Sequence, residues 1–460
     1  MPEKMDFTIK PLTPIFTGGL EGKCDRLHET GIIGSMRWWF EAIIRGMGGY
    51  ACDPTEHNSS CPVEKKVNGK EVKCYCDACV VFGTTGLKRA FNLQLDSQKN
   101  VNKDSRLDVK IKNNPNRGWY LNQGIEEEIS GSFLIPAYSA SNTNITATEL
   151  RELLIIALFL ASEWGGLGAK SQQGYGSALL DQSIADFSQI HEIMEKLLER
   201  QDRRYIQGTN RLPRLDQFFF RKVRFDKSKY NNEHLERIIH ISGNNNSNIL
   251  PIAPLVRYHL RALIRESILF GYTDNDGNQH KRSNAAARWR LMGVMNGDYH
   301  KRDFGKVVGA WYCNKCNGQW TEKPTKSQHS NCDGKPIIKW KCTTCEKEWT
   351  FDPTKKNRTN ASEAQKIGRQ KSLINVSHAY LKDDQWELRI WGWVPPEFIG
   401  RVQRETVIDL LQQWTTSGGE LWKRCGLEPL KHFGCWVDML EGDISDNIKS
   451  LVAVKGGESK

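Results

Sequence analysis

Apolar residues recur at helical spacing in a short N-terminal segment: Met36, Trp39, Phe40, Ile43 and Met47. Positions three and four apart share one side of an α-helix, so the pattern predicts a helix over residues 36–47 with one buried face. Ser35 stands just before this stripe, and its hydroxyl can accept a hydrogen bond as the N-cap. A strand is expected before the helix, over residues 6–15.

The later apolar patterns extend this order of elements. Strands are expected near 90–95, 107–111 and 132–135, followed by a helix over 149–164. Strand, helix, strands, helix and strand is a ferredoxin-like order. A second unit begins near residue 216 with QFFFRKVRF. It continues with a helix over 255–270, strands over 372–381 and 386–393, and helices over 404–414 and 420–425. The fold class is therefore α+β, with two tandem modules at 1–195 and 196–460.

A second face of the first helix is cationic, because Arg37, Glu41 and Arg45 fall four residues apart. Trp38 lies at the edge of that face, so an aromatic plane and two guanidinium groups could share one surface. Single-stranded nucleic acid offers bases to stack and phosphates to pair with such a surface. The alternative is that both tryptophans are core and the arginines are solvated. The apolar stripe assigns Trp39 to the core and leaves Trp38 at the candidate RNA-facing edge.

The charge of the chain favours a polyanionic partner. Its 460 residues include 65 Lys and Arg against 54 Asp and Glu, a net charge of +11. Basic residues gather in two runs, over 88–117 and 196–229, although each run alone could be a solvated face. No apolar stretch reaches the length of a membrane span. The charged N-terminus is not a signal peptide, so we expect a cytoplasmic protein without a membrane partner.

The thirteen cysteines are clustered, which inside a cell favours metal binding over disulfides. The later cluster contains two C-x-x-C pairs in an insertion over 309–351: Cys313, Cys316, Cys342 and Cys345. Each pair presents two thiolates on one tight turn, and two pairs complete a tetrahedral zinc site. Cys332 and His329 are spare ligands. A redox role for one pair is the alternative, which the doubling of the motif disfavours.

The earlier cluster, in an insertion over 52–79, predicts a second structural zinc ion. Only Cys76 and Cys79 have the C-x-x-C spacing. Cys52 and Cys61 would supply the other two ligands, with Cys74 or His57 as substitutes.

A glycine-rich loop, GGLGAKSQQGYG at residues 165–176, follows the long helix. Glycines let backbone amides approach an anion closely, and Lys170 adds a positive charge. The loop is not a P-loop, because Ala169 replaces the glycine before Lys-Ser, and it is not a dinucleotide motif, because it follows a helix. A contact to a phosphodiester backbone fits better, with a plain turn as the alternative. Among the scattered histidines, only His28 is a candidate general base for RNA cleavage.

Five segments together resemble a known family. They are LTPIFTGG (12–19), GIIGSMRWWFEAIIRGMGGYACDPT (31–55), CDACVVFGTTGLKRAF (76–91), WGGLGAKSQQGYGS (164–177) and SHAYLKDDQWELRIWGWVP (377–395). They are similar to the first RAMP subunits of the Cmr complex, the type III-B CRISPR effector. The later zinc insertion departs from shorter members of that family, so the resemblance does not cover its role.

The resemblance implies two RAMP modules, which are RRM-like ferredoxin folds. It implies a non-catalytic subunit for antiviral defence, at the head end of a multi-subunit filament near the 3′ part of the CRISPR RNA. Its partners would be CRISPR RNA, target RNA and other Cmr subunits. The implied RNA contacts are Arg37, Trp38, Arg45, Lys88, Arg89 and Lys170, with Gly18, Gly19, Gly168 and Gly174 shaping the loops. The alternative is a RAMP endoribonuclease that processes precursor CRISPR RNA, with His28 as its base.

Overall fold

The computed structural model describes a set of segments and leaves gaps between them. The described residues are 3–19, 22, 24–53, 60–67, 70–96, 106–112, 114–136, 143–181, 190–199, 212–230, 232–242, 248–273, 279–283, 288, 291–293, 297–298, 307–313, 315, 319–320, 337–342, 348–351, 366–367, 372–395, 402–432 and 434–439. The chain divides into two compact units. The first contains 1–259, 374–395 and 410–460, and the second contains 260–373 and 396–409.

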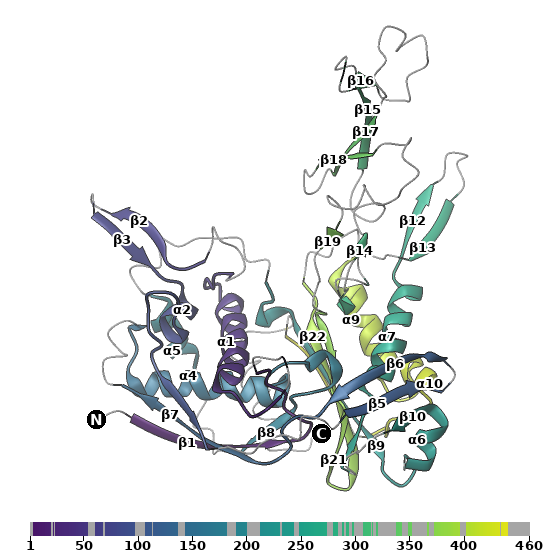
Figure 1. Ribbon diagram of the computed structural model, residues 1–460, viewed down its shortest axis with the longest axis horizontal. Coiled ribbons are helices and arrows are strands. Elements are labelled where there is room, and N and C mark those ends of the chain that lie inside the picture. Colours follow the sequence, from purple (N-terminus) through teal and green to yellow (C-terminus); the bar gives the residue numbers. More distant parts are fainter. Residues whose placement is uncertain are drawn as a thin grey trace. The chain divides into compact units, whose positions relative to one another are not determined.

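The first sheet of unit 1 is antiparallel and has the strand order β4-β7-β1-β8. Its strands are β1 (Glu3–Pro11), β4 (Asn92–Leu95), β7 (Ile129–Ile135) and β8 (Ala178–Asp181). Two helices pack together beside it, α1 (Glu29–Gly46) and α4 (Ala147–Phe159) (Figure 1). Alternate residues of β1 and β7, including Phe7, Ile9 and Phe133, are buried beneath the helices.

Helix α1 begins earlier than the sequence pattern predicts. It starts at Glu29 with His28 as its N-cap, so the prediction that Ser35 caps the helix is wrong. Ser35 instead lies inside the helix, where its hydroxyl donates to the Gly31 carbonyl oxygen (3.1 Å) and accepts from the Gly168 amide (2.8 Å). The predicted apolar stripe is confirmed at Met36, where the side chain is fully buried, and at its neighbours one turn on.

Helix α4 begins with a capping box, in which Thr146 and Glu149 exchange side-chain and backbone hydrogen bonds. It continues into a π-helical turn over Leu160–Trp164, which leads to the glycine-rich loop. That loop contains a 3-10 turn over Ser171–Gln173 and then enters β8.

The second sheet of unit 1 is also antiparallel, with the order β11-β21-β22-β9-β23 and β20 paired to β22. Its strands are β9 (Phe218–Asp226), β11 (Ile249–Leu250), β20 (Ile374–Val376), β21 (Ala379–Lys382), β22 (Gln385–Trp393) and β23 (Gly434–Asp438). In both sheets, the strand that comes first in the sequence lies between the last strand and the last but one. Strand β22 is buried from Trp386 to Trp393.

Among the described residues, the later part of the chain forms the helices α6 (Asn232–Ile238), α7 (Ala253–Ser267), α9 (Arg404–Thr415) and α10 (Glu420–Cys425). Helix α5 (Ile190–Leu198) belongs to the first half and packs against α4. None of the helices in the described segments combines the length and the apolar character that crossing a bilayer requires.

A third sheet joins the two halves of unit 1. Strand β5 (Arg106–Ile111) pairs with β6 (Asn114–Asn122) as a hairpin, and β10 (Ile239–Ser242) from the second half adds to β5. Figure 1 shows these three strands side by side next to α6. The sequence pattern predicts β5, but it contains nothing that predicts this pairing.

The sheets described in unit 2 are small and antiparallel. One pairs β12 (Leu269–Thr273) with β13 (Gln279–Ser283), and another pairs β14 (Gly297–Asp298) with β19 (Lys366–Ile367). A four-stranded sheet has the order β16-β15-β17-β18. Its strands are β15 (Val307–Tyr312), β16 (Gln319–Trp320), β17 (Ile337–Cys342) and β18 (Glu348–Phe351). The strands of this sheet carry the aromatic residues that flank the later C-x-x-C pairs.

Candidate metal centre and RNA-facing loops

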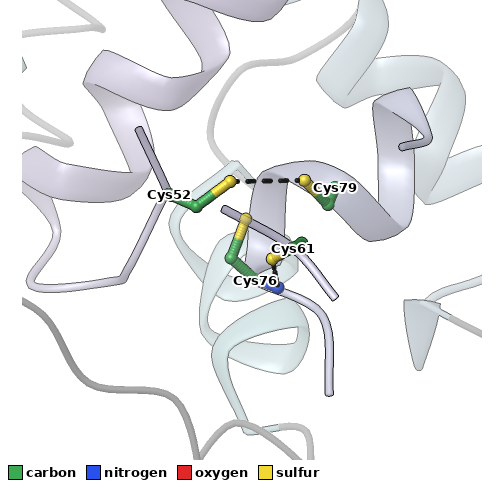
Figure 2. Close-up of side chains that lie close together, drawn as sticks. All are labelled: Cys52, Cys61, Cys76 and Cys79. Carbon is green, nitrogen blue, oxygen red and sulfur yellow. Dashed lines mark hydrogen bonds between the residues drawn. The ribbon is translucent and has the colours of Figure 1, made fainter. Parts of the chain in front are cut away.

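Four cysteines of the earlier cluster meet in unit 1. Their sulfur atoms all lie within 4.8 Å of one another, and all four side chains are buried: Cys52, Cys61, Cys76 and Cys79. Figure 2 shows the side chains pointing toward a common centre. Within the described part of the chain, this is the one group of His, Cys, Asp and Glu that could hold a metal ion. It contains the four residues predicted as ligands, whereas Cys74 lies outside the group and His57 lies outside the described residues.

Two short elements bring these cysteines together. The chain leaves α1 and passes Cys52. The hairpin of β2 (Val63–Val67) and β3 (Lys70–Cys74) then begins just after Cys61. Cys76 is the N-cap of α2 (Asp77–Phe82), and Cys79 lies in the first turn of that helix. The buried Asp77 carboxylate accepts a hydrogen bond from the Tyr50 amide (3.2 Å), which ties α2 to the segment that carries Cys52.

The spacing of the sulfurs fits a tetrahedral zinc ion. With Zn–S bonds of about 2.3 Å, neighbouring sulfurs of a tetrahedron lie about 3.8 Å apart, and the Sγ atoms of Cys52 and Cys79 are 3.6 Å apart. This distance is too long for a disulfide, and all four cysteines are free thiols. The Cys76 amide donates to the Cys61 sulfur (3.1 Å). The donor set and its geometry therefore fit the group that the sequence predicts.

The thiols of the cluster strongly perturb one another. Hydrogen bonds from the thiols of Cys61, Cys76 and Cys79 lower the pKa of Cys52 far below its usual range. The same network raises the pKa of Cys79, and its hydrogen bond with Cys52 is the largest cause. A thiolate at Cys79 would lie beside the thiolate of Cys52, and the two negative charges repel each other. A divalent cation removes this conflict, since it allows all four sulfurs to be thiolates.

Arg37 belongs to the surroundings of this cluster. Its guanidinium donates from Nη2 to the Cys79 sulfur (3.1 Å), from Nη1 to the Gly83 carbonyl oxygen (2.8 Å) and from Nε to the Glu41 carboxylate (2.8 Å). Although burial lowers its pKa, the Cys79 sulfur and then Glu41 raise it above the usual arginine value. Arg37 therefore holds a cysteine ligand and the turn that follows α2, and its donors point into the protein.

The prediction that Arg45 lies on an exposed face is wrong. Only 2 % of Arg45 is exposed, and its guanidinium donates to Glu41 (2.9 Å) and to the Pro213 carbonyl oxygen (3.2 Å). Glu41, itself 5 % exposed, thus lies between two arginines, one helical turn away on either side. The predicted spacing of the three side chains is correct, but it builds an internal ion-pair ladder instead of a surface for phosphates.

The paired tryptophans pack on the second half of unit 1. Trp39 is 2 % exposed and contacts Phe218 and Trp393 with its ring, so its prediction as a core residue is confirmed. Trp38 is half-buried, and its ring meets that of Trp393 edge to face at a centroid distance of 4.3 Å. Part of the Trp38 ring is therefore covered by Trp393.

The glycine-rich loop lies against the loop between β1 and α1. Ala169 donates its amide to the Phe16 carbonyl oxygen (2.7 Å), and the Lys170 ammonium lies over the Phe16 ring at 3.6 Å from its centroid. Lys170 also donates to the Asn122 side chain (2.9 Å) and remains half-exposed. Burial lowers the pKa of Lys170 from its usual value. The structure thus brings the predicted Lys170 beside the segment that contains Gly18 and Gly19.

Two glycines of the loop are required by their surroundings. Gly168 has φ +79°, and a Cβ there would lie 2.5 Å from the Phe16 carbonyl oxygen. Gly174 has φ +102°, and its Cβ would lie 2.6 Å from Nδ1 of His378. Gly19 also has no space for a side chain, since its Cβ would meet Asp25 at 2.7 Å, whereas Gly18 is open. Gly168 therefore allows the close approach of the two loops.

His28 and Asp25 form a pair at the edge of this surface. Nε2 of His28 lies 2.7 Å from Oδ1 of Asp25, and the histidine side chain is 20 % exposed. Hydrogen bonding to His28 lowers the pKa of Asp25. Sequence reasoning missed Asp25, as well as Asn122 and His378, because their roles arise only from contacts that folding creates.

Lys88 and Arg89 lie together in an exposed turn after α2. Arg89 leans toward Phe91, with its guanidinium carbon 5.8 Å from the ring centroid. Arg37 donates to the Gly83 carbonyl oxygen at the start of this turn and also to the Cys79 sulfur. The turn that carries Lys88 and Arg89 is therefore linked through Arg37 to the cysteine cluster.

The later zinc prediction concerns mostly residues outside the described set. Cys313 is buried at the end of β15, and Cys342 is the last residue of β17. Cys316 and Cys345, with the spare candidates Cys332 and His329, lie outside the described residues. The second zinc site therefore stays a prediction.

A comparison with known families gives a match to the first part of the chain. The model of the RAMP superfamily matches residues 8–179, which contain the β1–α1 loop, the cysteine cluster and the glycine-rich loop. The resemblance carried by the sequence motifs is thus confirmed over this segment.

Among solved structures, the chain is similar to Cmr1 from Pyrococcus furiosus in its apo form. The identity is 11 %, the TM-score is 0.33, and the alignment covers 87 % of this chain and 91 % of that one. It is also similar to a chain of the type III-B Cmr-beta complex bound to cognate target RNA and AMPPnP in the presence of single-stranded DNA. That identity is 11 %, the TM-score is 0.41, and 98 % and 100 % of the two chains are covered. No curated protein matches the chain.

Proposed function

We propose that this chain is a non-catalytic RNA-binding subunit of a type III-B CRISPR effector complex. In this proposal it lies at the head end of the complex, near the 3′ part of the CRISPR RNA, in the cytoplasm of a prokaryote. It helps to hold the guide and to engage target RNA, together with other Cmr subunits.

The observation that carries the proposal is the pairing of two loops inside the RAMP-matched segment. The Phe16–Ala169 bridge joins them, and glycines let their backbones approach closely. Lys170 adds a half-exposed cation at this junction. A partly exposed lysine beside two closely packed loops can pair with the phosphates of a phosphodiester chain.

The strand orders support tandem ferredoxin-like modules. In the order β4-β7-β1-β8 the first strand of the set lies between the third and the last, and β21-β22-β9-β23 repeats this arrangement. We infer that each sheet with its helices is one RAMP module. The chain between them and the insertions would then be additions to this repeated core.

The competing function is cleavage of precursor CRISPR RNA with His28 as base, which the nearby Asp25 could orient. Incubation of the purified chain with labelled repeat RNA, without added metal, separates the two functions. The non-catalytic proposal predicts intact RNA. A discrete product that His28→Ala abolishes would establish the nuclease instead.

Binding of single-stranded RNA tests the proposal directly. Fluorescence anisotropy should show that Lys170→Ala weakens binding about threefold or more and lowers the salt slope by about one, as for the loss of one phosphate contact. Lys170→Arg should keep most of the affinity, and Lys66→Ala, on the separate β2 strand, is the matched control for an exposed lysine. Wild-type protein that binds no RNA alone or in the assembled complex would refute the proposal.

We further propose that the four-cysteine cluster holds a structural zinc ion. In that role, Cys52, Cys61, Cys76 and Cys79 fasten the β2–β3 hairpin and α2 to the end of α1, and the zinc supplies a closed tetrahedral cross-link. Metal analysis of the purified chain should find zinc. One equivalent corresponds to this cluster alone, and two correspond to this cluster together with the later C-x-x-C pairs.

A further inference from the structure

The sheet that joins the two halves of unit 1 has two unlike faces. One face is apolar and covered, with Val109 and Ile111 of β5, Leu121 of β6 and Ile239 of β10 all buried. The other face is exposed and polar. In register it presents Lys110 opposite both His240 and Gly118, and Tyr120 opposite Asp108. Tyr120 is an aromatic residue on this exposed face, where the packing of the core does not require one.

Tyr120 is the most exposed of the large apolar side chains in the described segments, at 59 %. It stands on β6, two residues before Asn122, so the two side chains are on one face about 7 Å apart along the strand. Asn122 accepts the hydrogen bond of Lys170, and the Tyr175 hydroxyl donates to its backbone carbonyl oxygen. The exposed face therefore continues without a break into the loop surface around Lys170.

Gly118 shapes the cationic part of this face. A Cβ at Gly118 would lie 3.1 Å from Cγ of Lys110, so the aliphatic stem of Lys110 extends across β6 at the position where the glycine leaves space. The side chain of Lys110, from β5, therefore extends over β6, the strand that carries Tyr120. A β-branched or larger residue at position 118 would displace it.

We propose that this face binds single-stranded RNA, with a base stacked on Tyr120 and the backbone passing between Lys110 and Lys170. The proposal rests on the RNA-binding function proposed above and adds a binding surface to it. Base stacking on an exposed aromatic side chain, with cations beside it, is how single strands are held without sequence preference. Asp108, opposite Tyr120, can accept from a base amino group but not from a phosphate.

The chemistry of the face favours RNA over a protein partner. Apart from Tyr120, the outward positions that the structure describes carry no large apolar side chain: Asp108, Lys110, Gly118, Asn122, His240 and Ser242. The centre of a protein interface is normally apolar and depleted of charge. One aromatic plane between lysines matches a chain of bases and phosphates better.

The experiment compares RNA affinities of the full chain with Tyr120→Ala, Tyr120→Phe and Lys110→Ala. Tyr120→Ala should weaken binding of a labelled single strand roughly tenfold, while Tyr120→Phe should bind like the wild type, because stacking needs only the ring. An abasic strand of the same length should bind wild type and Tyr120→Ala equally. Lys110→Ala should reduce the salt slope by about one, and thermal melts should show that all three variants fold.

The outcomes separate this inference from the function on which it rests. If wild type binds RNA, Lys170→Ala weakens binding and Tyr120→Ala does not, the sheet face is not a binding surface and the proposed function stands. A Tyr120→Ala variant that assembles poorly with other subunits but binds RNA normally would assign the face to a protein, which also overturns the inference. If wild type binds no RNA in any form, the proposed function itself fails.

Discussion

Helix α1 serves two candidate sites of opposite character from residues only two positions apart. Ser35 accepts the Gly168 amide and so anchors the glycine-rich loop, whereas Arg37 donates to the Cys79 sulfur and anchors the cysteine cluster. The cluster is closed, because its four sulfurs face one another and the guanidinium of Arg37 points inward to it. The loop surface is open, because Lys170 rests on an aromatic ring and keeps part of its surface in solvent.

The contrast shows how differently the two sites use their positively charged side chains. Arg37 and Arg45 have planar groups with several donors, and each finds acceptors inside the protein. Lys170 has a compact ammonium on a flexible stem, and its protein partners are a ring and one amide oxygen. Only the second arrangement leaves a cation able to exchange its contacts for a phosphate.

The largest expected effect comes from opening the closed site. Cys79→Ser should remove the metal and destabilise the region around α2 severely, because structural zinc supplies much of the folding energy of its surroundings. Metal analysis and thermal melts should show zinc loss together with a lower, broader transition. EDTA treatment of the wild type should reproduce both changes.

Cys24→Ser is the matched control for this prediction, since Cys24 is equally buried but lies outside the cluster. It should retain its full zinc content. Cys74→Ser tests the substitute ligand considered from the sequence and should also retain zinc. Equal zinc in Cys79→Ser and the wild type would mean that the cluster is not a metal site.

The next effect concerns the ion-pair ladder inside α1. Arg45→Ala should destabilise unit 1 by about 3 kcal/mol, because it leaves Glu41 buried with one of its two cations removed. The RNA affinity of the folded protein should not change, because Arg45 faces the core. Chemical denaturation and anisotropy on the same sample measure the two quantities separately.

A double replacement sharpens this test. Glu41→Leu with Arg45→Leu removes the buried Glu41–Arg45 pair, while Arg37 keeps its acceptors on Gly83 and Cys79. The double variant should recover part of the lost stability, as is often found when buried pairs are replaced by apolar residues. An Arg45→Ala variant that keeps its stability but binds RNA several times more weakly would return Arg45 to the RNA-facing surface predicted from the sequence.

The sequence predicted local structure well where one periodicity dominates. The stripe through Met36 and Trp39, the long helix before the glycine loop and the buried β22 all appear where expected, although α1 starts seven residues earlier than predicted. The four cysteines of the candidate metal centre were also predictable, because C-x-x-C spacing encodes a local turn and nearby cysteines must complete such a site.

What the sequence could not show are contacts between distant segments. The acceptors that turn Arg45 inward include the carbonyl oxygen of Pro213, and the joining of β10 to β5 unites residues more than a hundred positions apart. Sequence patterns mark the face of a helix, but not whether another segment covers it. For this reason the cationic face of α1 was predicted to be exposed, and the sheet with Tyr120 was not predicted.

The smallest expected effect lies beneath the open site, at His378. This residue is 3 % exposed, its amide donates to the Gly174 carbonyl oxygen, and burial lowers its pKa to about 3. The unfolded chain takes up a proton near pH 6.5, whereas the folded protein does not until about pH 3. Stability is therefore complete above pH 6.5 and falls as the pH drops, by about 2 kcal/mol between pH 7 and pH 5. Denaturation of His378→Gln, which has no such group, should show a pH dependence weaker by that amount. An identical pH dependence in both proteins would mean that His378 takes up its proton in the folded state, and that the floor of the glycine loop is open to water like the surface above it.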